Sequence, residues 1–505
     1  MNNTLITTMK IKYLVLGLIL FFSFGVTLAQ RQTMRLTLDE VIDIAQKQSP
    51  DALQAKNRFI GSYWQFRTFQ AGFMPALSLS ATLPRFSRSI NQVTQGDGSV
   101  QFIPQTQSTA TLGLSLTQNL SMTGGQLFMT SDLQRLDFFS NPTSTNYATN
   151  PVSIGIRQPL FKFNDFKWQR KIEPLRYQEA EKKLIEDREQ IALTAVSMFF
   201  DLLSTQISMK VQMTNLANND TLYKIAKGRF NIGTIAENDL LQLELQLLSA
   251  QSQVESMKLD LENKVFNLKS YLRLQNDVAI ELIPPTKTSN IKIEADKAIE
   301  QSMENRSVYP SYKRRLLEAE NNVLKAKASS HFTANLVALY GTTQSSPELA
   351  GAYRSPSDLE QVSISLQVPI LDWGQGKGRV KIAESNQALE QSSVEQQTID
   401  SKQEVYLKVM QFNIQQSQVQ IAAKTDTVAQ KRYDVTKQRY FIGKIGITDL
   451  NIAQNEKDNA RRGYFDALQT FWRNFYEIRK LTLFDFVRDS RIFIDPLELK
   501  AVNSQ

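Results

Sequence analysis

Hydrophobic residues recur with helical spacing over two unusually long segments of this chain. Between Asp165 and about Lys227 there is no glycine and a single proline, Pro174, and between Glu237 and Arg273 there is neither. At 1.5 Å per residue, the first of these helices would be on the order of 100 Å long. A compact core does not need helices of that length, whereas coiled coils and helical barrels do.

The second long helix carries two hydrophobic seams. Its main seam steps by three and four residues, as in a heptad coiled coil, and continues after one extra four-residue step. Two seams indicate neighbours on two sides, as in a closed ring of helices, while an ordinary buried helix with two apolar flanks remains the alternative. The main seam comprises Leu240, Leu243, Leu247, Ala250, Val254, Met257, Leu261, Val265, Leu268 and Leu272, and the second comprises Leu241, Leu245 and Leu248.

Between the helices, short segments alternate apolar and polar residues with the period of a β-strand. The clearest are 109–117, with its apolar residues at even positions, and 362–368; residues 76–81 and 334–340 are similar. About ten alternating residues suffice for a transmembrane barrel strand, although a half-buried soluble strand gives the same pattern. Flanking aromatic residues fit either a membrane-interface girdle or helix packing. They are Trp64, Phe66, Phe69, Phe73, Phe163, Phe166 and Trp168.

The two halves of the chain repeat each other at an offset of 210 residues. Residues 223–240, YKIAKGRFNIGTIAENDL, align with 433–450, YDVTKQRYFIGKIGITDL, and residues 154–160 align with 364–370. Two anchors with one offset indicate a tandem duplication. Each half is predicted to contain a helix, strands, a long helix, a turn and a second long helix. The opening helices are expected over 38–73 and 298–332.

The first half is about fifty residues longer before its long helix. Pro75 and Pro159 are 84 residues apart, whereas Thr333 and Pro369 are 36 apart. The surplus favours an extra pair of strands, and therefore six rather than four strands per chain. The alternative is a hairpin standing outside the membrane with its short turn outermost. The extra strands are expected near 109–119 and 126–136, with connections at roughly 84–108, 120–125 and 137–151.

The N-terminus predicts export. Lys10 and Lys12 precede an apolar run from Tyr13 to Leu28, followed by small residues at a cleavage position. Residues 1–29 are therefore predicted to be a secretory signal peptide, with a retained membrane anchor as the alternative. No later stretch looks apolar enough for a transmembrane helix, so any membrane entry is expected through strands.

Composition gives little support to catalysis. There is no cysteine, and His331 is the only histidine. A thiol-based site, a lipid-anchored cysteine, a histidine metal cluster and a Ser-His-Asp triad are therefore disfavoured, and we expect neither enzyme activity nor a cofactor or metal. The net charge of +8 by itself does not indicate a nucleic-acid partner, and none is expected.

The chain resembles the TolC-like outer membrane efflux proteins over nearly all of its mature length. The resemblance rests on the tandem halves, on the strand-to-helix junctions 158–161 and 368–374, and on the two turns 229–233 and 439–443. It implies a mainly α-helical chain with membrane β-strands: long antiparallel hairpins forming a periplasmic tunnel below a trimer-shared β-barrel. With four strands per chain the barrel would have twelve strands, and with six it would have eighteen.

The resemblance also implies function, partners and location. The chain would be a passive exit duct in the outer membrane, embedded in outer membrane lipid as a homotrimer. It would dock to a periplasmic adaptor (membrane fusion) protein and to an inner-membrane RND or ABC transporter, in a tripartite efflux pump or a type I secretion system. An exported coiled-coil scaffold or adhesin without a pore remains the alternative, although it gives no reason for strands at the same point of each repeat.

Two groups of site residues follow from the resemblance. Asp239, Tyr440, Lys444 and Asp449 match or adjoin positions that close the periplasmic end, and Arg229, Gly233, Arg439 and Gly443 belong to the adaptor-docking tips. The match is incomplete, because Ile452 replaces a second acidic residue and Ile445 replaces an arginine. Plain helix capping by the two aspartates is the alternative.

The predicted organisation follows the duplication. It comprises the signal peptide (1–29), a first repeat (30–280), a linker containing Pro284 and Pro285 (281–297), a second repeat (298–483) and a C-terminal tail (484–505).

Overall fold

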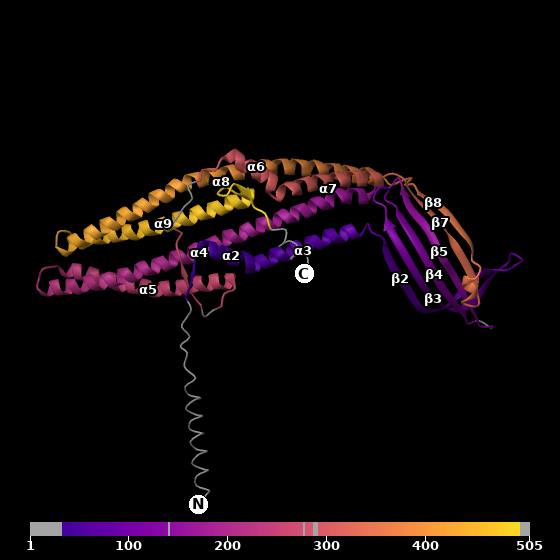
Figure 1. Cartoon of the computed structure of the whole chain (residues 1–505), viewed down its shortest axis with the longest axis horizontal. Coiled ribbons are helices and arrows are strands. Elements are labelled where there is room, and N and C mark those ends of the chain that lie inside the picture. The colour runs from indigo at the N-terminus through magenta and orange to yellow at the C-terminus, as the bar shows by residue number, and fades with distance from the viewer. Residues whose placement is uncertain (1–32, 140–141, 276–277, 286–290, 495–505) are drawn as a thin grey trace, which may run out of the picture. The chain divides into compact units, whose positions relative to one another are not determined.

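The structure, a computed structural model, describes residues 33–139, 142–275, 278–285 and 291–494 (Figure 1). The predicted signal peptide and the end of the predicted tail lie outside these residues. The described chain forms two compact units that each draw segments from both repeats. The hairpin unit contains 33–53, 190–291 and 411–477, and the sheet unit contains 54–189, 292–410 and 478–494, within the described residues.

Two helical hairpins make up most of the hairpin unit. The first joins α4 (Asp165–Asn231) to α5 (Glu237–Leu272), and the second joins α8 (Gln375–Phe441) to α9 (Ile447–Thr482). α4 and α8 begin in the sheet unit, and α9 ends there. Alongside them lie β1 (Thr33–Leu36), α2 (Leu38–Gln48) and β6 (Ala279–Leu282), with β1 and β6 paired in parallel.

The helix boundaries confirm the duplication. The start and end of α8 and of α9 each lie 210 residues after those of α4 and α5. The two pairs therefore match from end to end without a net insertion. The main seam of α5 is also confirmed, because Leu243, Leu268 and Leu272 are fully buried. The second seam, Leu241, Leu245 and Leu248, remains exposed in the single chain.

One expectation about the helices is wrong. α4 has an 18-residue window with a mean hydropathy of 1.4, long and apolar enough by composition to cross a membrane. Half of that window is buried inside the structure. Phe199 and Phe200 of α4 are buried, and elsewhere in the same unit Phe412 and Phe471 pack with ring centroids 5.2 Å apart. We therefore interpret the apolar window of α4 as a core segment.

The opening helix of each repeat is broken in two, which corrects the prediction of single helices over 38–73 and 298–332. In the first repeat, α2 is followed by α3 (Pro50–Ala71), and the Ser49 hydroxyl accepts the Ala52 N–H at 3.1 Å. Ser49 caps α3, and Pro50 stands at its first position, where the missing N–H costs nothing. The second repeat breaks between α6 (Ala295–Asn305) and α7 (Val308–Ser329), and α6 begins just inside the predicted linker.

A six-stranded antiparallel sheet dominates the sheet unit (Figure 1). Its strand order is β2-β3-β4-β5-β7-β8, so the extra pair predicted for the first repeat is confirmed as part of the sheet. The strands are β2 (Ala76–Thr94), β3 (Val100–Asn119), β4 (Gln126–Phe138), β5 (Ser144–Leu160), β7 (Thr333–Ser346) and β8 (Ser357–Gln367). The short helix η1 (Gly351–Tyr353) joins β7 to β8, and β9 (Phe484–Asp485) pairs with β10 (Ser490–Arg491).

The predicted long connections are wrong. Residues 84–108 mostly continue β2 and β3, which pair from Ala76–Thr117 to Thr94–Val100 across one register shift at Thr82 to Arg85. Residues 137–151 mostly belong to β4 and β5. The strands continue past the point where apolar and polar side chains alternate. Strand pairing uses backbone N–H and C=O groups, and only proline lacks the N–H.

Candidate functional site: the sheet and the hairpin tips

One face of the sheet is apolar across all six strands, and most of its side chains are exposed. In β3, Leu112, Leu114 and Leu116 occupy the even positions that the sequence predicted. The strand register extends this face in both directions, because Leu114 pairs with Leu79 and Leu116 with Met129. It continues through Leu127, Ile154, Ile156, Leu336, Val362, Ile364 and Leu366. A contiguous apolar band of this kind fits a lipid environment and not water.

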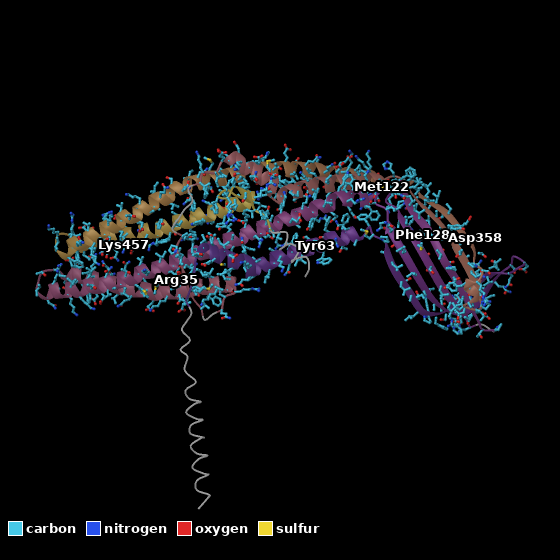
Figure 2. All side chains as sticks on the ribbon, viewed as in Figure 1. Arg35, Tyr63, Met122, Phe128, Asp358 and Lys457 are labelled. Carbon is cyan, nitrogen blue, oxygen red and sulfur yellow. The ribbon has the colours of Figure 1, made fainter. Side chains whose placement is uncertain are left out.

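The opposite face is mostly polar, with Phe128, Val337 and Leu339 as apolar exceptions. Ser80 pairs with Gly113 and Ser115 with Thr130 across neighbouring strands. Gly155 has a specific role on this face, because a Cβ there would lie 2.4 Å from the Phe128 ring. The Arg157 guanidinium in turn lies 5.5 Å from the centre of that ring. Figure 2 labels Phe128 within the sheet. The polar face has the character of a water-filled lumen.

The inserted hairpin belongs to the sheet and does not stand outside it. The turn between β3 and β4 lies against the beginning of α4, where Asn164 Nδ2 donates to the Ser121 and Met122 carbonyls at 3.1 Å each. Arg170 Nη1 donates to the Ser121 hydroxyl at 2.8 Å. The short turn is therefore at the helix end of the sheet, which contradicts the alternative that placed it outermost.

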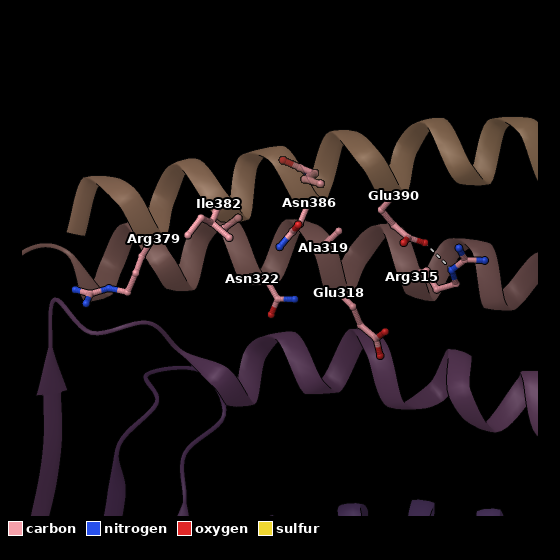
Figure 3. Close-up of a pocket in the computed structure, with 10 residues that line it drawn as sticks. Arg315, Glu318, Ala319, Asn322, Arg379, Ile382, Asn386 and Glu390 are labelled. Carbon is pink, nitrogen blue, oxygen red and sulfur yellow. Dashed lines mark ion pairs between the residues drawn. The ribbon is translucent and has the colours of Figure 1, made fainter. Parts of the chain in front are cut away.

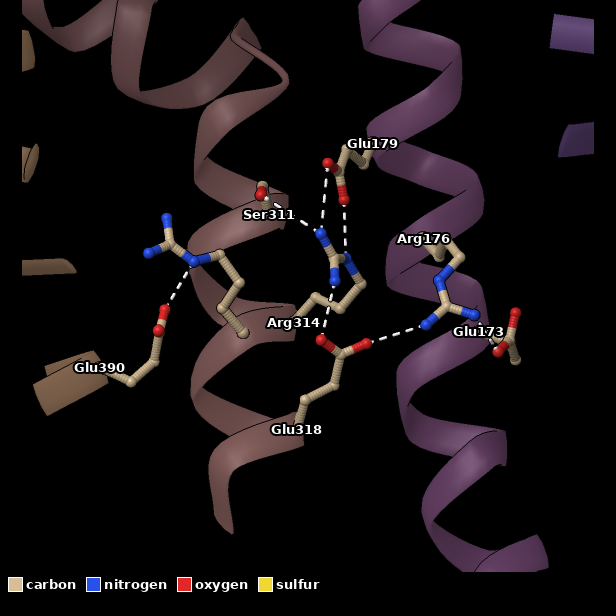
Figure 4. Close-up of polar contacts among 8 residues, drawn as sticks. Glu173, Arg176, Glu179, Ser311, Arg314, Glu318 and Glu390 are labelled. Atoms are coloured by element: carbon tan, nitrogen blue, oxygen red, sulfur yellow. Dashed lines mark hydrogen bonds and ion pairs between the residues drawn. The ribbon is translucent and has the colours of Figure 1, made fainter. Parts of the chain in front are cut away.

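Charged residues fasten the helices that support the sheet. Arg314 of α7 makes two hydrogen bonds to Glu179 of α4, at 2.8 and 3.4 Å, and pairs with Glu318, which also binds Arg176 at 2.8 Å (Figure 4). Beside them, α7 and α8 border a groove of about 470 Å³ (Figure 3). It is lined in part by Arg315, Asn322, Arg379, Ile382 and Glu390.

The two hairpin tips have the same backbone geometry. Gly233 and Gly443 follow α4 and α8 with φ of +74° and +72°. Each donates its N–H to a carbonyl three residues back, and the next residue donates five residues back, as in a Schellman cap. Glycine is favoured at both positions because an L side chain is strained at positive φ. The predicted tip residues Arg229 and Arg439 accept these longer bonds at their carbonyls.

A hydrophobic cluster joins the two tips within one chain. Its buried members include Leu222 and Leu243 of the first hairpin and Tyr440 and Leu450 of the second. The Arg229 guanidinium also donates to the Phe441 carbonyl at 2.7 Å. The two tips of one chain are thus held by apolar packing and one charge-assisted hydrogen bond.

The predicted gate residues are only partly brought together. Burial raises the pKa of Tyr440; the Arg229 charge opposes that rise, and the Asp239 charge adds to it. Tyr440 and Asp239 therefore interact electrostatically, but no hydrogen bond joins them among the described residues. Lys444 and Asp449 are exposed, and Asp449 lies in the first turn of α9, where a carboxylate is favoured by the helix dipole.

Sequence reasoning missed a buried polar network deeper between the hairpins. Asn215 Nδ2 donates to Asp458 Oδ2 at 2.7 Å, and Lys457 Nζ lies 3.1 Å from Asp458 Oδ1. The same ammonium lies 4.4 Å from the centre of the Tyr433 ring. Burial, with the Asp458 charge as a second cause, raises the pKa of Tyr433 to about 12. The available signal was the adjacent Lys457–Asp458 pair in the helix that repeats the seam-bearing helix of the first half.

The described residues offer no candidate metal-binding site. Within the described ranges, no group of three or more His, Cys, Asp or Glu side chains is arranged to hold a metal ion.

The fold and its sites define a class: a membrane channel protein with a lipid-facing sheet and long helical hairpins. A family profile described as outer membrane efflux protein matches residues 41–272 and 314–482. The chain therefore belongs to the outer membrane efflux protein family. It is an outer membrane channel with its helices in the periplasm, and it serves as an exit duct.

Solved structures share this fold at low sequence identity. The CmeC outer membrane channel of Campylobacter jejuni is 17% identical, with a TM-score of 0.66 over 92% of this chain and 89% of that chain. VceC of Vibrio cholerae is 14% identical, with 0.64 over 90% and 96%. The open state of the MtrE channel of Neisseria gonorrhoeae is 16% identical, with 0.59 over 88% of each chain. No curated protein matches the chain.

Proposed function

We propose that three copies of this chain form one channel whose barrel has eighteen strands. The observation that carries the proposal is the sheet itself: its apolar face is exposed, and β2 and β8 form its two edges. An open edge in lipid leaves backbone groups without partners, so the sheet must be closed by further copies. Three sheets of six strands give an even-numbered barrel within the known range.

Gel analysis and labelling test this assembly. Unheated samples in detergent are expected to run as a trimer that dissociates on boiling, and purified protein is expected to conduct ions in planar bilayers. A periplasmic monomer without conductance would overturn the proposal. For orientation, Met122→Cys lies at the helix end of the sheet and Asp97→Cys at the opposite turn. An impermeant maleimide added to intact cells should label only Asp97→Cys.

The hairpin tips are proposed to bind a periplasmic adaptor that connects the duct to an RND or ABC transporter. Ile232 and Ile442 are 74% and 66% exposed beside the two tip glycines, so each tip offers an apolar side chain to a partner. Cysteines at Ile232 and Ile442 should cross-link to the adaptor, whereas the matched control Ile382→Cys, at the start of α8, should not. Cross-linking at Ile382 alone would refute tip docking.

We further propose that Asp239, Tyr440, Lys444 and Asp449 keep the periplasmic end closed. The support is the position of Tyr440, buried between the tips and within the electrostatic reach of Asp239 and Arg229. The double variant Tyr440→Phe/Asp239→Ala should raise conductance and sensitivity to vancomycin. Asp220→Ala, which removes an exposed carboxylate paired with Lys224, is the control. Equal conductance of the double variant and the control would leave these residues as caps only.

A further inference from the structure

The junction between the sheet and the long helices carries an excess of positive charge. Residues 161–172 contain four Lys or Arg and one Asp, and residues 371–385 contain three Lys or Arg, one Asp and one Glu. We propose that this junction binds the anionic headgroups of phospholipids in the leaflet nearest the helices. The inference rests on the proposed insertion of the sheet into a bilayer.

The acidic residues of the junction are already engaged. Asp165 pairs with Lys325 at 2.9 Å, and Glu384 pairs with Lys381 and Lys327 at 2.9 and 3.2 Å. Asp372 accepts the backbone N–H groups of Gly374 and Gly376 at 3.0 and 2.7 Å, and these bonds hold its pKa below the usual range.

Three lysines at the junction remain without a counter-charge. Lys162, Lys167 and Lys377 are exposed, and their side chains make no hydrogen bond or ion pair with any described residue. Arg379 is also exposed, and its charge acts on Asp372, whose carboxylate already accepts two N–H groups. In Figure 3 it extends from the first turns of α8 toward the sheet end, away from the Arg315–Glu390 pair.

The positions of these cations are unusual for helices. Lys167 is in the first turn of α4 and Lys377 in the first turn of α8, at an offset of 210; Lys171 and Lys381 share that offset one turn later. A helix N-terminus carries partial positive charge, so cations there are disfavoured unless an anion is present. Asp165 in the first turn of α4 and Asp372, which accepts two N–H groups at the start of α8, already offset the dipole at the two helix starts. The repeated lysines, and not free N–H groups, are therefore what these neighbouring helix starts offer to a phosphate.

Aromatic residues fix the depth of the junction in the bilayer. Phe161 and Trp373 are 69% and 87% exposed and lie in the short segments that precede α4 and α8. Both adopt positive φ, of +58° and +53°, a strained conformation for bulky residues. Lys171 Nζ lies 4.8 Å from the Trp168 ring. Aromatic rings next to cations are typical of the membrane–water interface, at the level of the headgroups.

The parts of the junction lie together in space. Phe161 and Phe332 have ring centroids 5.0 Å apart, which joins the segment before α4 to the segment after α7. A Cβ on Gly376 would lie 3.0 Å from Ser330, so the start of α8 meets the end of α7. The apolar face of β8 leads directly into exposed Ile370 and Leu371. Because the charged patch is continuous with the lipid-facing surface, we assign a membrane phosphate as its partner.

Tryptophan quenching by brominated lipids tests the proposal. The channel is reconstituted in mixtures of phosphatidylcholine and phosphatidylglycerol, one of them brominated, and relative binding is read from tryptophan emission, to which Trp64, Trp168 and Trp373 contribute. The basic-patch variant carries Lys162→Gln, Lys167→Gln, Lys377→Gln and Arg379→Gln. The matched control carries the same loss of charge at exposed lysines elsewhere: Lys313→Gln, Lys402→Gln, Lys424→Gln and Lys431→Gln.

The native protein and the control are expected to prefer phosphatidylglycerol by about tenfold, given the contribution of each basic residue near an anionic surface. The basic-patch variant should fall to within about twofold, and high salt should reduce the native preference. Equal quenching by both headgroups in the native protein, or an unchanged preference in the patch variant, overturns the inference and leaves the channel intact. Absence of quenching by either lipid would instead contradict insertion, and with it the proposed function.

Discussion

Arg479, near the end of α9, fastens the last helix to α4 and to the following strand. Its guanidinium donates to Glu189 at 2.9 and 3.1 Å and to Asp485 at 2.7 Å. The Glu189 side chain is only 3% exposed. All three residues belong to the sheet unit. Arg479→Ala would leave one carboxylate buried without its counter-charge.

The expected cost follows from that burial. Removing one partner of a buried, hydrogen-bonded ion pair typically costs about 3–5 kcal/mol, because the remaining charge stays desolvated. Asp485 contributes less to this penalty, since the Val487 and Arg488 N–H groups still donate to it at 2.9 and 3.2 Å. A loss of about 3–5 kcal/mol, at 1.36 kcal/mol per tenfold, corresponds to roughly a hundredfold to a few thousandfold more frequent opening of the local structure.

Hydrogen exchange followed by mass spectrometry measures this opening. Arg479→Ala should lose protection in residues 478–492 by about two to three orders of magnitude if that segment opens locally. Arg479→Met combined with Glu189→Leu removes both charges and should recover most of the protection, because an apolar pair of similar size is often neutral. Native-like protection in Arg479→Ala, or no recovery in the double variant, would refute the electrostatic reasoning.

Three further predictions concern the hairpin unit. Gly443→Ala imposes a side chain at φ +72° and should destabilise the second tip by about 1 kcal/mol, seen as faster exchange at the tip amides. The control Gly228→Ala should not, because Gly228 lies in the last turn of α4, where an added Cβ would meet open space. Lys457→Met should lower the free energy of unfolding by about 3 kcal/mol, because it leaves the Asp458 carboxylate buried without its counter-charge. The double variant Lys457→Met/Asp458→Leu should recover part of that stability. Equal melting temperatures of the two variants would contradict this reasoning. Tyr433 should ionise near pH 12, measured as the ultraviolet difference spectrum against Tyr433→Phe. Because the pKa of Tyr433 in the folded state lies above the unfolded value of 10, its contribution to stability is complete below pH 10 and is lost as the pH rises toward 12.

Local periodicity accounts for much of what the sequence predicted. The scarcity of glycine and proline located α4 and α5 closely, and the 210-residue offset carried those boundaries to α8 and α9. Alternation also identified the apolar face of β3 at its even positions. These features are encoded within one element, because helical and strand periods decide which side chains share a face.

Other features depended on partners far along the chain. The full length of β2 and β3 came from backbone pairing that alternation does not report. At the break in the second opening helix, the Ser307 N–H donates to Glu186 at 2.8 Å, a partner 121 residues away. The Arg229 bond to the Phe441 carbonyl joins residues 212 apart, and the Asn215–Asp458 contact joins residues 243 apart. A hydrophobic pattern states which face must be covered but not what covers it, so only the tertiary structure decided these contacts.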